Sequence, residues 1–416
     1  ISAAGNERES FQLIVAPFDE LKNVTVSASV LATNSGATLP ASAVTIQPIA
    51  YIEVRDNAFL YKDARPGMWP DVLLDNRAFD LSPRLQPYMV TVAVPAGQTP
   101  GLYQGTLTVK ADGLAPCTVD YQCQVYNFSL PVRGEMKTWF SMCFVPEDKE
   151  LRRQHYDAFF EHRLNPVSMY ACFHRGYPHW FAPALEDVPY CLSRGMNFLT
   201  IGYLWDYSVK EGWQFEDEYI QIVVDYVRSV KPQLEKMGAW EITHVNGFDE
   251  IMHKPDKRDA RLAVARKTCA ALKQAFPDLK IANIGNVMDI SNDLMDTWFV
   301  SPVPAKRFRG IQARGGFVAF YWAYQDPSFM LDQPGLAPRL CAWLTYKEGA
   351  SGMGYYSTLR PHNAQVSPAG LKGRDKVLAE GHREPTYAMS CTERCLPTNP
   401  PEGLDWTREH YNIETT

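Results

Sequence analysis

The stretch DEYIQIVVDYVRSVKPQLEKMGAWEITHVNGFDE, residues 217 to 250, decides the fold because it joins two kinds of apolar pattern. Its first part repeats apolar residues at helical spacing from Tyr219 to Val230, and Gly238 is a natural helix stop. Its second part, WEITHVNGF (240 to 248), has the length of a buried strand and ends on two adjacent acids, Asp249 and Glu250. A helix followed by a buried strand is the repeating unit of a parallel α/β fold.

The same alternation continues on both sides of this stretch. RDARLAVARKTCAALKQAF (258 to 276) predicts a second amphipathic helix. Eight alternations of strand and helix predict a parallel sheet closed into a TIM-type (β/α)8 barrel over residues 134–360. The predicted strands are TWFSMCFV (138 to 145), PVSMYACF (166 to 173), NFLTIGYL (197 to 204), WEITHVNGF, KIANIGNV (280 to 287), DTWFVSPV (296 to 303), FVAFYWAY (317 to 324) and SGMGYYS (351 to 357).

Residues 1–133 show a different pattern, with apolar residues at every second position. The runs VTVSASV (24 to 30), YQGTLTV (103 to 109) and VDYQCQV (119 to 125) each place four small or apolar side chains on one face. Turn signals such as TNSG, PAGQTPG and ADG separate the runs. Alternation bounded by turns predicts an N-terminal antiparallel β-sandwich ahead of the barrel.

The composition narrows the classes of partner. The chain has 41 Lys and Arg against 47 Asp and Glu, a net charge of −6 without a basic cluster, which argues against a nucleic-acid partner. No apolar run approaches the roughly 20 residues that a membrane span needs. The nine cysteines are scattered without a C-x-x-C pair, so we expect buried thiols and no metal cluster. Nothing in the sequence indicates a cofactor or an oligomeric state.

A barrel places function at the C-terminal ends of its strands. Asp249 and Glu250 end one predicted strand, and amide and aromatic side chains end others. Carboxylates surrounded by amides and rings favour a glycosidase. The candidate substrate-binding residues are Asn286, Tyr321, Trp322, Tyr324, Tyr355 and Tyr356.

The two adjacent acids allow two interpretations. Neighbouring residues of an ideal strand point to opposite faces, so both acids reach one pocket only if the backbone turns at the strand end. One acid could then hold a proton for a leaving group while the other stays charged, which suits substrate-assisted glycoside cleavage. Alternatively, a pair of acids often begins a helix, where negative charge is favourable.

Other catalytic classes lack their motifs. Glu250 and His253 form a single Glu-x-x-His, whereas di-iron carboxylate sites need two copies. The chain has no H-E-x-x-H and no G-x-S-x-G. GASGMG (349 to 354) lacks the Lys of a phosphate-binding loop.

Several motifs in order resemble glycoside hydrolase family 123. They are NERESFQLIV, VPAGQTPGLYQGTLTV, GFDE, MDTWFVSPV, FYWAYQDP and PRLCAWLTYKEGASGMGYYS, which together span residues 1 to 357. The resemblance implies a retaining, exo-acting β-N-acetylgalactosaminidase. Glu250 would be the general acid/base, and Asp249 would hydrogen-bond the acetamido N–H of the substrate. A periplasmic or secreted protein acting on glycans would be expected.

The chain departs from the family pattern at two places. The last strand ends in Tyr355 and Tyr356, where the family has an aromatic residue and a Trp. Residues 361–416 are rich in Pro and polar residues, where the family has an acidic helix that closes the barrel, so we expect a divergent, disordered tail and a missing closing helix. Two alternatives therefore remain: an inactive carbohydrate-binding or surface-structural protein, and a hydrolase of a different acetamido sugar.

Overall fold

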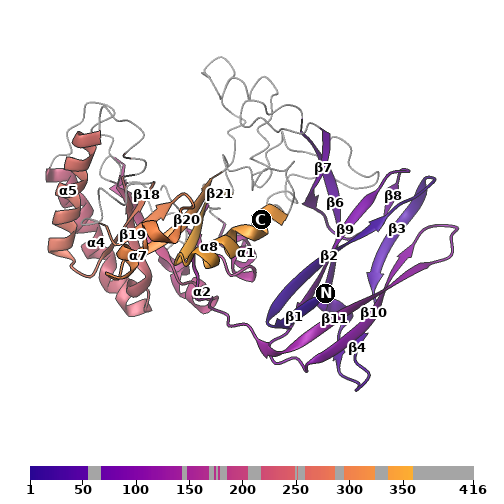
Figure 1. Ribbon diagram of the computed structural model, residues 1–416. Helices are drawn as coiled ribbons and strands as arrows, with labels where there is room; N and C mark the ends of the chain where they lie inside the picture. Colours follow the sequence, from indigo (N-terminus) through magenta and orange to yellow (C-terminus); the bar gives the residue numbers. More distant parts are fainter. Residues whose placement is uncertain are drawn as a thin grey trace, which may run out of the picture. The chain divides into compact units, whose positions relative to one another are not determined.

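The computed structural model describes residues 1–54, 67–142, 148–167, 173–174, 177–178, 185–204, 217–248, 251, 258–285, 295–323 and 336–358. The chain divides into two compact units, one over Ile1–Val132 and one over Arg133–Pro361 (Figure 1). The tail predicted over residues 361–416 lies outside the described residues.

The first unit contains two β-sheets. Its strands are β1 (Ser2–Gly5), β2 (Glu7–Val15), β3 (Leu21–Ala28), β4 (Leu31–Ala32), β5 (Thr38–Leu39), β6 (Val44–Val54), β7 (Gly67–Leu73), β8 (Phe79–Leu81), β9 (Gln86–Val94), β10 (Gly101–Lys110) and β11 (Cys117–Ser129). One sheet has the order β1-β11-β10-β3-β8, with β4 and β5 attached to β10, and the other has the order β2-β9-β6-β7. Pairing is antiparallel except between β1 and β11, which run parallel.

The apolar residues of alternating positions form the core of this unit, as the period-2 pattern predicts. Val26 of β3, Leu107 of β10 and Val125 of β11 belong to one buried cluster. Two predicted core positions are corrected. Val30 is exposed because β3 ends two residues before it, and Val119 is exposed near the start of β11.

A left-handed residue carries the chain from one sheet to the other. Asn6 lies between β1 and β2 with φ 56°, a conformation that Asn tolerates better than most residues. Its side chain donates a hydrogen bond to the carbonyl of Leu130 at 2.9 Å, just past the end of β11. The turn at Asn6 therefore links the two sheets of the sandwich.

The second unit contains the predicted eight parallel strands. They are β12 (Lys137–Met142), β13 (Pro166–Val167), β16 (Leu199–Leu204), β17 (Thr243–Gly247), β18 (Lys280–Ile284), β19 (Thr297–Val300), β20 (Phe317–Ala323) and β21 (Gly352–Thr358). Their order is β13-β12-β21-β20-β19-β18-β17-β16, so the last strand pairs with the first and the sheet curls into a nearly closed barrel. The predicted sandwich followed by a TIM-type barrel is confirmed. A separate short pair joins β14 (Phe173–His174) and β15 (Tyr177–Pro178).

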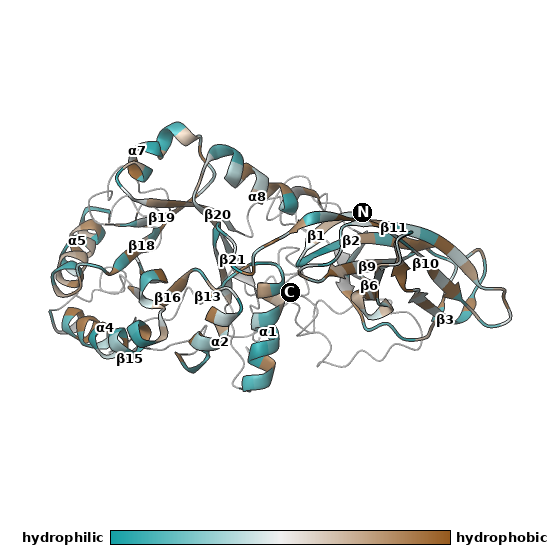
Figure 2. Cartoon of the chain, turned by 90° about the horizontal axis from the view of Figure 1, so that it is seen from below, coloured by the Kyte–Doolittle hydropathy of each residue, from teal (hydrophilic) through white to brown (hydrophobic). Residues whose placement is uncertain are grey.

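Helices lie outside the ring of strands (Figure 2). They are α1 (Lys149–Glu161), α2 (Val188–Ser193), α4 (Asp217–Met237), α5 (Arg258–Ala275), α7 (Arg309–Gln312) and α8 (Leu336–Glu348), with short 3-10 turns η1 (Ala41–Ala43) in the sandwich and η2 (Leu185–Asp187), η3 (Trp240–Ile242) and η6 (Ala305–Arg307) in the barrel unit. The two helices predicted from apolar spacing are confirmed as α4 and α5. Gly238 ends α4 with φ 73°, the left-handed geometry of a helix C-cap.

Aromatic rings fill the barrel interior. Trp139 of β12 contacts Phe299 of β19, with ring centroids 4.9 Å apart, although two strands separate them in the sheet order. Only the inside of the ring brings these side chains together. β21 makes room for them, because a Cβ at Gly354 would lie 2.8 Å from Trp139 Cε3 and 3.1 Å from Phe299 Cδ1.

One joint of the barrel lacks a backbone ladder among the described residues, the joint between β13 and β16. Buried amide side chains bridge it at the N-terminal end. Asn165 donates to Asn197 Oδ1 at 2.7 Å and accepts from the Asn197 backbone N–H at 2.9 Å. Asn165 also donates to the carbonyl of Thr138 on β12 at 3.0 Å. These bonds satisfy the buried Asn165 amide and the Asn197 backbone N–H.

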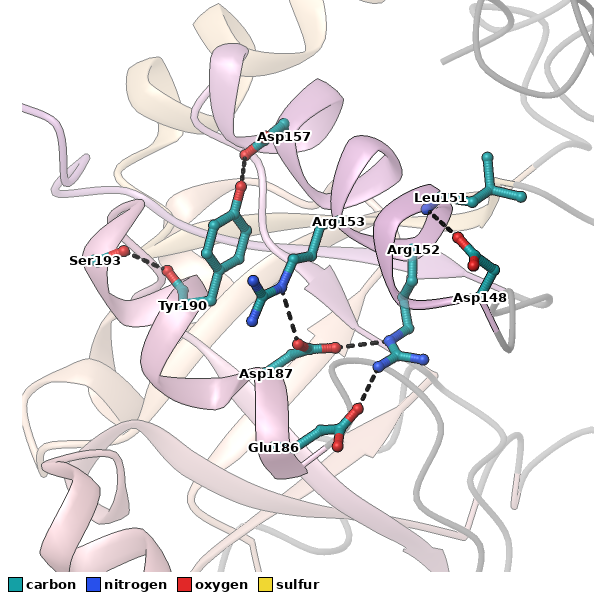
Figure 3. A network of polar contacts seen from close by, with 9 residues as sticks. All are labelled: Asp148, Leu151, Arg152, Arg153, Asp157, Glu186, Asp187, Tyr190 and Ser193. Atoms are coloured by element: carbon teal, nitrogen blue, oxygen red, sulfur yellow. Dashed lines mark hydrogen bonds and ion pairs between the residues drawn. The ribbon is translucent and has the colours of Figure 1, made fainter.

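Outside the same joint, ion pairs attach α1 to η2 and α2 (Figure 3). Asp187 is fully buried and accepts from Arg152 Nε at 2.6 Å and from Arg153 Nε at 3.2 Å. On the next turn of α1, Asp157 accepts from the Tyr190 hydroxyl at 2.6 Å. A buried carboxylate needs such partners because desolvation disfavours its charge.

Candidate active site

The acid pair follows the C-terminal end of β17. Asp249 and Glu250 themselves lie outside the described residues, as do Asn286 and Tyr324. The backbone of Tyr356 belongs to β21, but its side chain is also outside the described part. The described residues nearest to the acids in the sequence are those at the end of β17.

The backbone turns sharply just before the acids. β17 ends at Gly247, and Phe248 has φ 53°, a left-handed conformation that is strained for a bulky residue. The Phe248 N–H donates to the carbonyl of Leu204 on β16 at 2.9 Å. Two adjacent acids need a turn of this kind if they are to reach one pocket, because neighbouring residues of a regular strand point to opposite faces.

The neighbouring strand holds the same turn from the other side. Asn283 of β18 is fully buried, and its Nδ2 donates to the carbonyl of Gly247 at 3.0 Å and to that of Phe248 at 2.9 Å. Gly247 has no room for a side chain, because a Cβ there would lie 3.0 Å from Leu204 Cβ. Strands β16 and β18 thus both bond the last residues of β17.

Tyr321 faces the barrel interior near the C-terminal end of β20. Its ring lies 5.7 Å from the Trp139 ring, centroid to centroid, and the residue is partly exposed. It packs against the same interior cluster as Phe299. Of the predicted substrate-binding residues whose side chains are described, Tyr321 is the one that reaches the inside of the barrel, and its role stays a prediction.

Trp322 and Tyr355 lie on the outer face of the sheet. They are register partners on β20 and β21, and the Tyr355 ring is 5.9 Å from that of Phe140, which alternates with the inward Trp139. Both side chains are buried there, 5% and 1% exposed, and burial raises the pKa of Tyr355 above its usual value. The structure does not bring them together with Tyr321. Their role in substrate binding stays a prediction. Their buried position on the outer face of the sheet does not favour it.

Two polar residues of β17 point into the barrel below the acids. His244 stacks on Phe198 at 4.2 Å between ring centroids and donates from Nδ1 to the carbonyl of Ile242 at 3.0 Å. Burial, followed by the positive charges of Lys280 and Lys137, lowers the pKa of His244 to about 3. The imidazole is therefore neutral near pH 7.

Asn246 lies one inward position further along the strand. It is fully buried, and neither its Nδ2 nor its Oδ1 has a hydrogen-bond partner within the described structure. Buried amides without partners are rare in folded proteins. Asn246 and Asn283 were not predicted as site residues, because each sits inside an apolar run. The signal that could have found them is a polar residue within an otherwise apolar parallel strand.

Metal and thiol chemistry find no support in the described residues. No group of three or more His, Cys, Asp or Glu side chains is arranged there to hold a metal ion. Burial raises the pKa of the Cys269 thiol to about 12, so it is protonated at neutral pH. Within the described part of the chain, no helix has both the length and the apolar character of a membrane span.

Residues 2–111 match the family model described as the glycoside hydrolase 123 N-terminal domain. This match confirms the resemblance to glycoside hydrolase family 123 on the sandwich unit and supports a glycoside hydrolase. No curated protein matches the chain.

Two solved structures are similar over most of the chain. A family 123 glycoside hydrolase from Clostridium perfringens, which is described in connection with glycolipid glycan hydrolysis, is 15% identical with a TM-score of 0.62, covering 86% of this chain and 73% of that one. At this identity the likeness supports the fold alone. A family 39 glycoside hydrolase from Bacteroides cellulosilyticus WH2 is 10% identical with a TM-score of 0.39, covering 82% and 74%, which is too weak for any argument.

Proposed function

We propose that this chain is a glycoside hydrolase that removes terminal β-linked N-acetylgalactosamine from glycans or glycosphingolipids with retention of configuration. The observation that carries the proposal is the left-handed turn at Phe248, at the C-terminal end of β17, which immediately precedes Asp249 and Glu250 in the sequence. Active sites of this fold are built at the C-terminal ends of the strands. The family match of the N-terminal unit supports the same class of reaction. The glycolipid substrate named for the Clostridium perfringens protein is consistent with it.

In the proposed reaction the substrate supplies the nucleophile. Glu250 donates its proton to the glycosidic oxygen, and the carbonyl oxygen of the substrate's acetamide forms a bond to the anomeric carbon as the bond to the leaving group breaks. The product of this step is a cyclic oxazolinium ion. Asp249 accepts a hydrogen bond from the acetamide N–H and stabilises the positive charge that develops on the ring.

A second step releases the sugar. Glu250, now a carboxylate, removes a proton from a water molecule, and the water oxygen attacks the anomeric carbon while the oxazolinium ring opens. Two inversions at the same carbon give net retention. Because the intermediate is held by the sugar's own amide, no second enzyme carboxylate needs to reach the anomeric carbon.

Paired substrates test this mechanism. The purified chain is incubated with an aryl β-N-acetylgalactosaminide and with the matching aryl β-galactoside, which lacks the acetamide. Release from the first substrate alone supports substrate assistance, and equal release from both contradicts it. Proton NMR of the first-formed sugar should show the β-anomer. The aryl β-N-acetylglucosaminide is the third arm, because faster cleavage there would assign a different acetamido sugar.

Substitution of the acids tests their separate roles. We expect Glu250→Gln to reduce kcat by about 10²- to 10⁴-fold on an unactivated glycan, since general acid catalysis contributes on that scale. Asp249→Asn should impair acetamido substrates most. Either variant retaining wild-type turnover would remove that residue from the mechanism. A wild-type chain that binds N-acetylgalactosamine in a calorimeter but releases no sugar would instead identify an inactive carbohydrate-binding protein.

A further inference from the structure

The last residues of β17 are unusually constrained for the end of a strand. Phe248 takes a left-handed φ of 53°, which is unfavourable for a residue with a large side chain, and it is fully buried. A strained conformation persists only where the surroundings hold it. Here the holding bonds come from two other strands, β16 through Leu204 and β18 through Asn283.

The Asn283 amide bonds to two successive carbonyls. Its Nδ2 is 3.0 Å from the Gly247 oxygen and 2.9 Å from the Phe248 oxygen, so both amide protons are used on the chain that precedes Asp249. The orientation of the amide follows from these contacts, because turning it over would place Oδ1 against two carbonyl oxygens.

This arrangement leaves a buried acceptor unused. Asn283 is fully buried, and its Oδ1 has no hydrogen-bond partner within the described structure. A hydrocarbon side chain at this position would avoid that penalty but would leave two carbonyls without their donor. The Asn283 amide therefore satisfies the carbonyls at the turn, although its own oxygen has no hydrogen-bond partner among the described residues.

The second of the two bonds bears directly on the acids. The Phe248 carbonyl belongs to the planar peptide group that also contains the backbone nitrogen of residue 249. Fixing the direction of that carbonyl fixes the plane from which the chain continues to Asp249 and Glu250. Catalytic groups that are misplaced by about 1 Å lose on the order of 100-fold in rate.

We propose that Asn283 is a positioning residue for catalysis, acting through the backbone of Gly247 and Phe248 on the acid pair. This inference rests on the proposed function of Asp249 and Glu250. It adds a residue on a neighbouring strand that touches neither substrate nor reacting atoms. Its effect should appear in the chemical step and leave substrate affinity nearly unchanged.

The test compares Asn283 with a matched buried amide elsewhere in the barrel. Asn165 is also buried and donates to the Thr138 carbonyl at 3.0 Å and to Asn197 at 2.7 Å, but it lies at the N-terminal end of the strands. Asn283→Ala, Asn283→Asp and Asn165→Ala are prepared in the full chain. The aspartate keeps the shape of Asn283 and removes its amide donors.

Steady-state kinetics on the aryl β-N-acetylgalactosaminide provide the first measurement. We expect both Asn283 variants to lose about 10- to 100-fold in kcat with KM within threefold of wild type. Asn165→Ala should keep kcat within twofold of wild type, even if its melting temperature falls as much as that of the Asn283 variants. Unchanged kcat in Asn283→Ala, or an equal loss in Asn165→Ala, would overturn the proposal.

Hydrogen exchange provides a measurement that does not depend on turnover. The Phe248 amide, which is bonded to Leu204, should exchange at least 10-fold faster in Asn283→Ala than in wild type, and at the wild-type rate in Asn165→Ala. Unchanged exchange in Asn283→Ala would refute the backbone clamp. If the clamp is seen but the wild-type chain cleaves no glycoside, the proposed function fails and the catalytic role of Asn283 fails with it.

Discussion

The buried imidazole of His244 predicts a pH-dependent loss of stability that a single substitution should abolish. Its ordinary pKa of 6.5 falls to about 3 in the folded chain, first through burial and then through Lys280 and Lys137. Between these two pH values the His244 imidazole is protonated in the unfolded chain and neutral in the folded chain. Stability from this group is therefore fully present above about pH 6.5 and is lost progressively as the pH falls toward 3.

The two pKa values give the size of the effect. Between pH 7 and pH 5 the group should lower the free energy of unfolding by about 2 kcal/mol, since one pKa unit corresponds to roughly 1.4 kcal/mol. His244→Phe keeps an aromatic ring against Phe198 but cannot titrate. The variant also loses the hydrogen bond to Ile242 at 3.0 Å, which changes its stability by an amount that does not depend on pH. Only the change with pH is compared.

Urea unfolding followed by tryptophan fluorescence at pH 7, 6 and 5 measures the effect. The wild-type chain should lose about 2 kcal/mol more than His244→Phe over this range. Burial also lowers the pKa of His155, but that residue is present in both proteins and its contribution cancels. A difference between wild type and variant that stays constant from pH 7 to pH 5 would refute a neutral, desolvated imidazole.

Two further predictions concern the barrel framework. Gly354→Ala should lower the free energy of unfolding by about 1–3 kcal/mol, because the new Cβ would lie 2.8 Å from the Trp139 side chain. Gly310→Ala in α7 is the control and should not destabilise the chain, because its nearest contact is at 3.8 Å. Equal urea midpoints for the two variants would contradict the packing argument. Asp187→Asn should lower the free energy of unfolding, because it removes the buried carboxylate that pairs with both Arg152 and Arg153 and leaves Arg152 with the more exposed Glu186 as its charged partner. The exposed pair of Arg228 and Asp225 on α4 is the control, since Arg228→Gln should cost less than about 1 kcal/mol in the same titration.

The fold followed from periodicity because its elements bury one consistent face. The apolar spacing of α4 and α5 and the eight apolar runs led to the observed helices and parallel strands. Boundaries were less certain. The run predicted as a strand from residue 240 begins with the 3-10 turn η3, and β17 starts only at Thr243. A short apolar run has the same composition in either conformation, so its pattern does not locate the change.

The site was harder to predict because parallel strands are apolar on both faces. Taking the last residues of each run grouped Tyr321 with Trp322, although alternation puts one inside the barrel and the other outside. Which parity faces inward depends on contacts across the ring, such as Trp139 with Phe299, and these join residues far apart in sequence. Asn283 was not predicted for the same reason, because its role depends on the end of the neighbouring strand β17, to which its side chain is hydrogen-bonded.

Buried side chains hold β13 beside β16 in addition to the chain connection between them. Every strand pairing recorded in the described part of the ring would survive in a circularly permuted chain with its new ends between these two strands. Such a permutant would lose the covalent connection there and depend on Asn165 with Asn197, and on Asp187 with Arg152, to keep the two sides together.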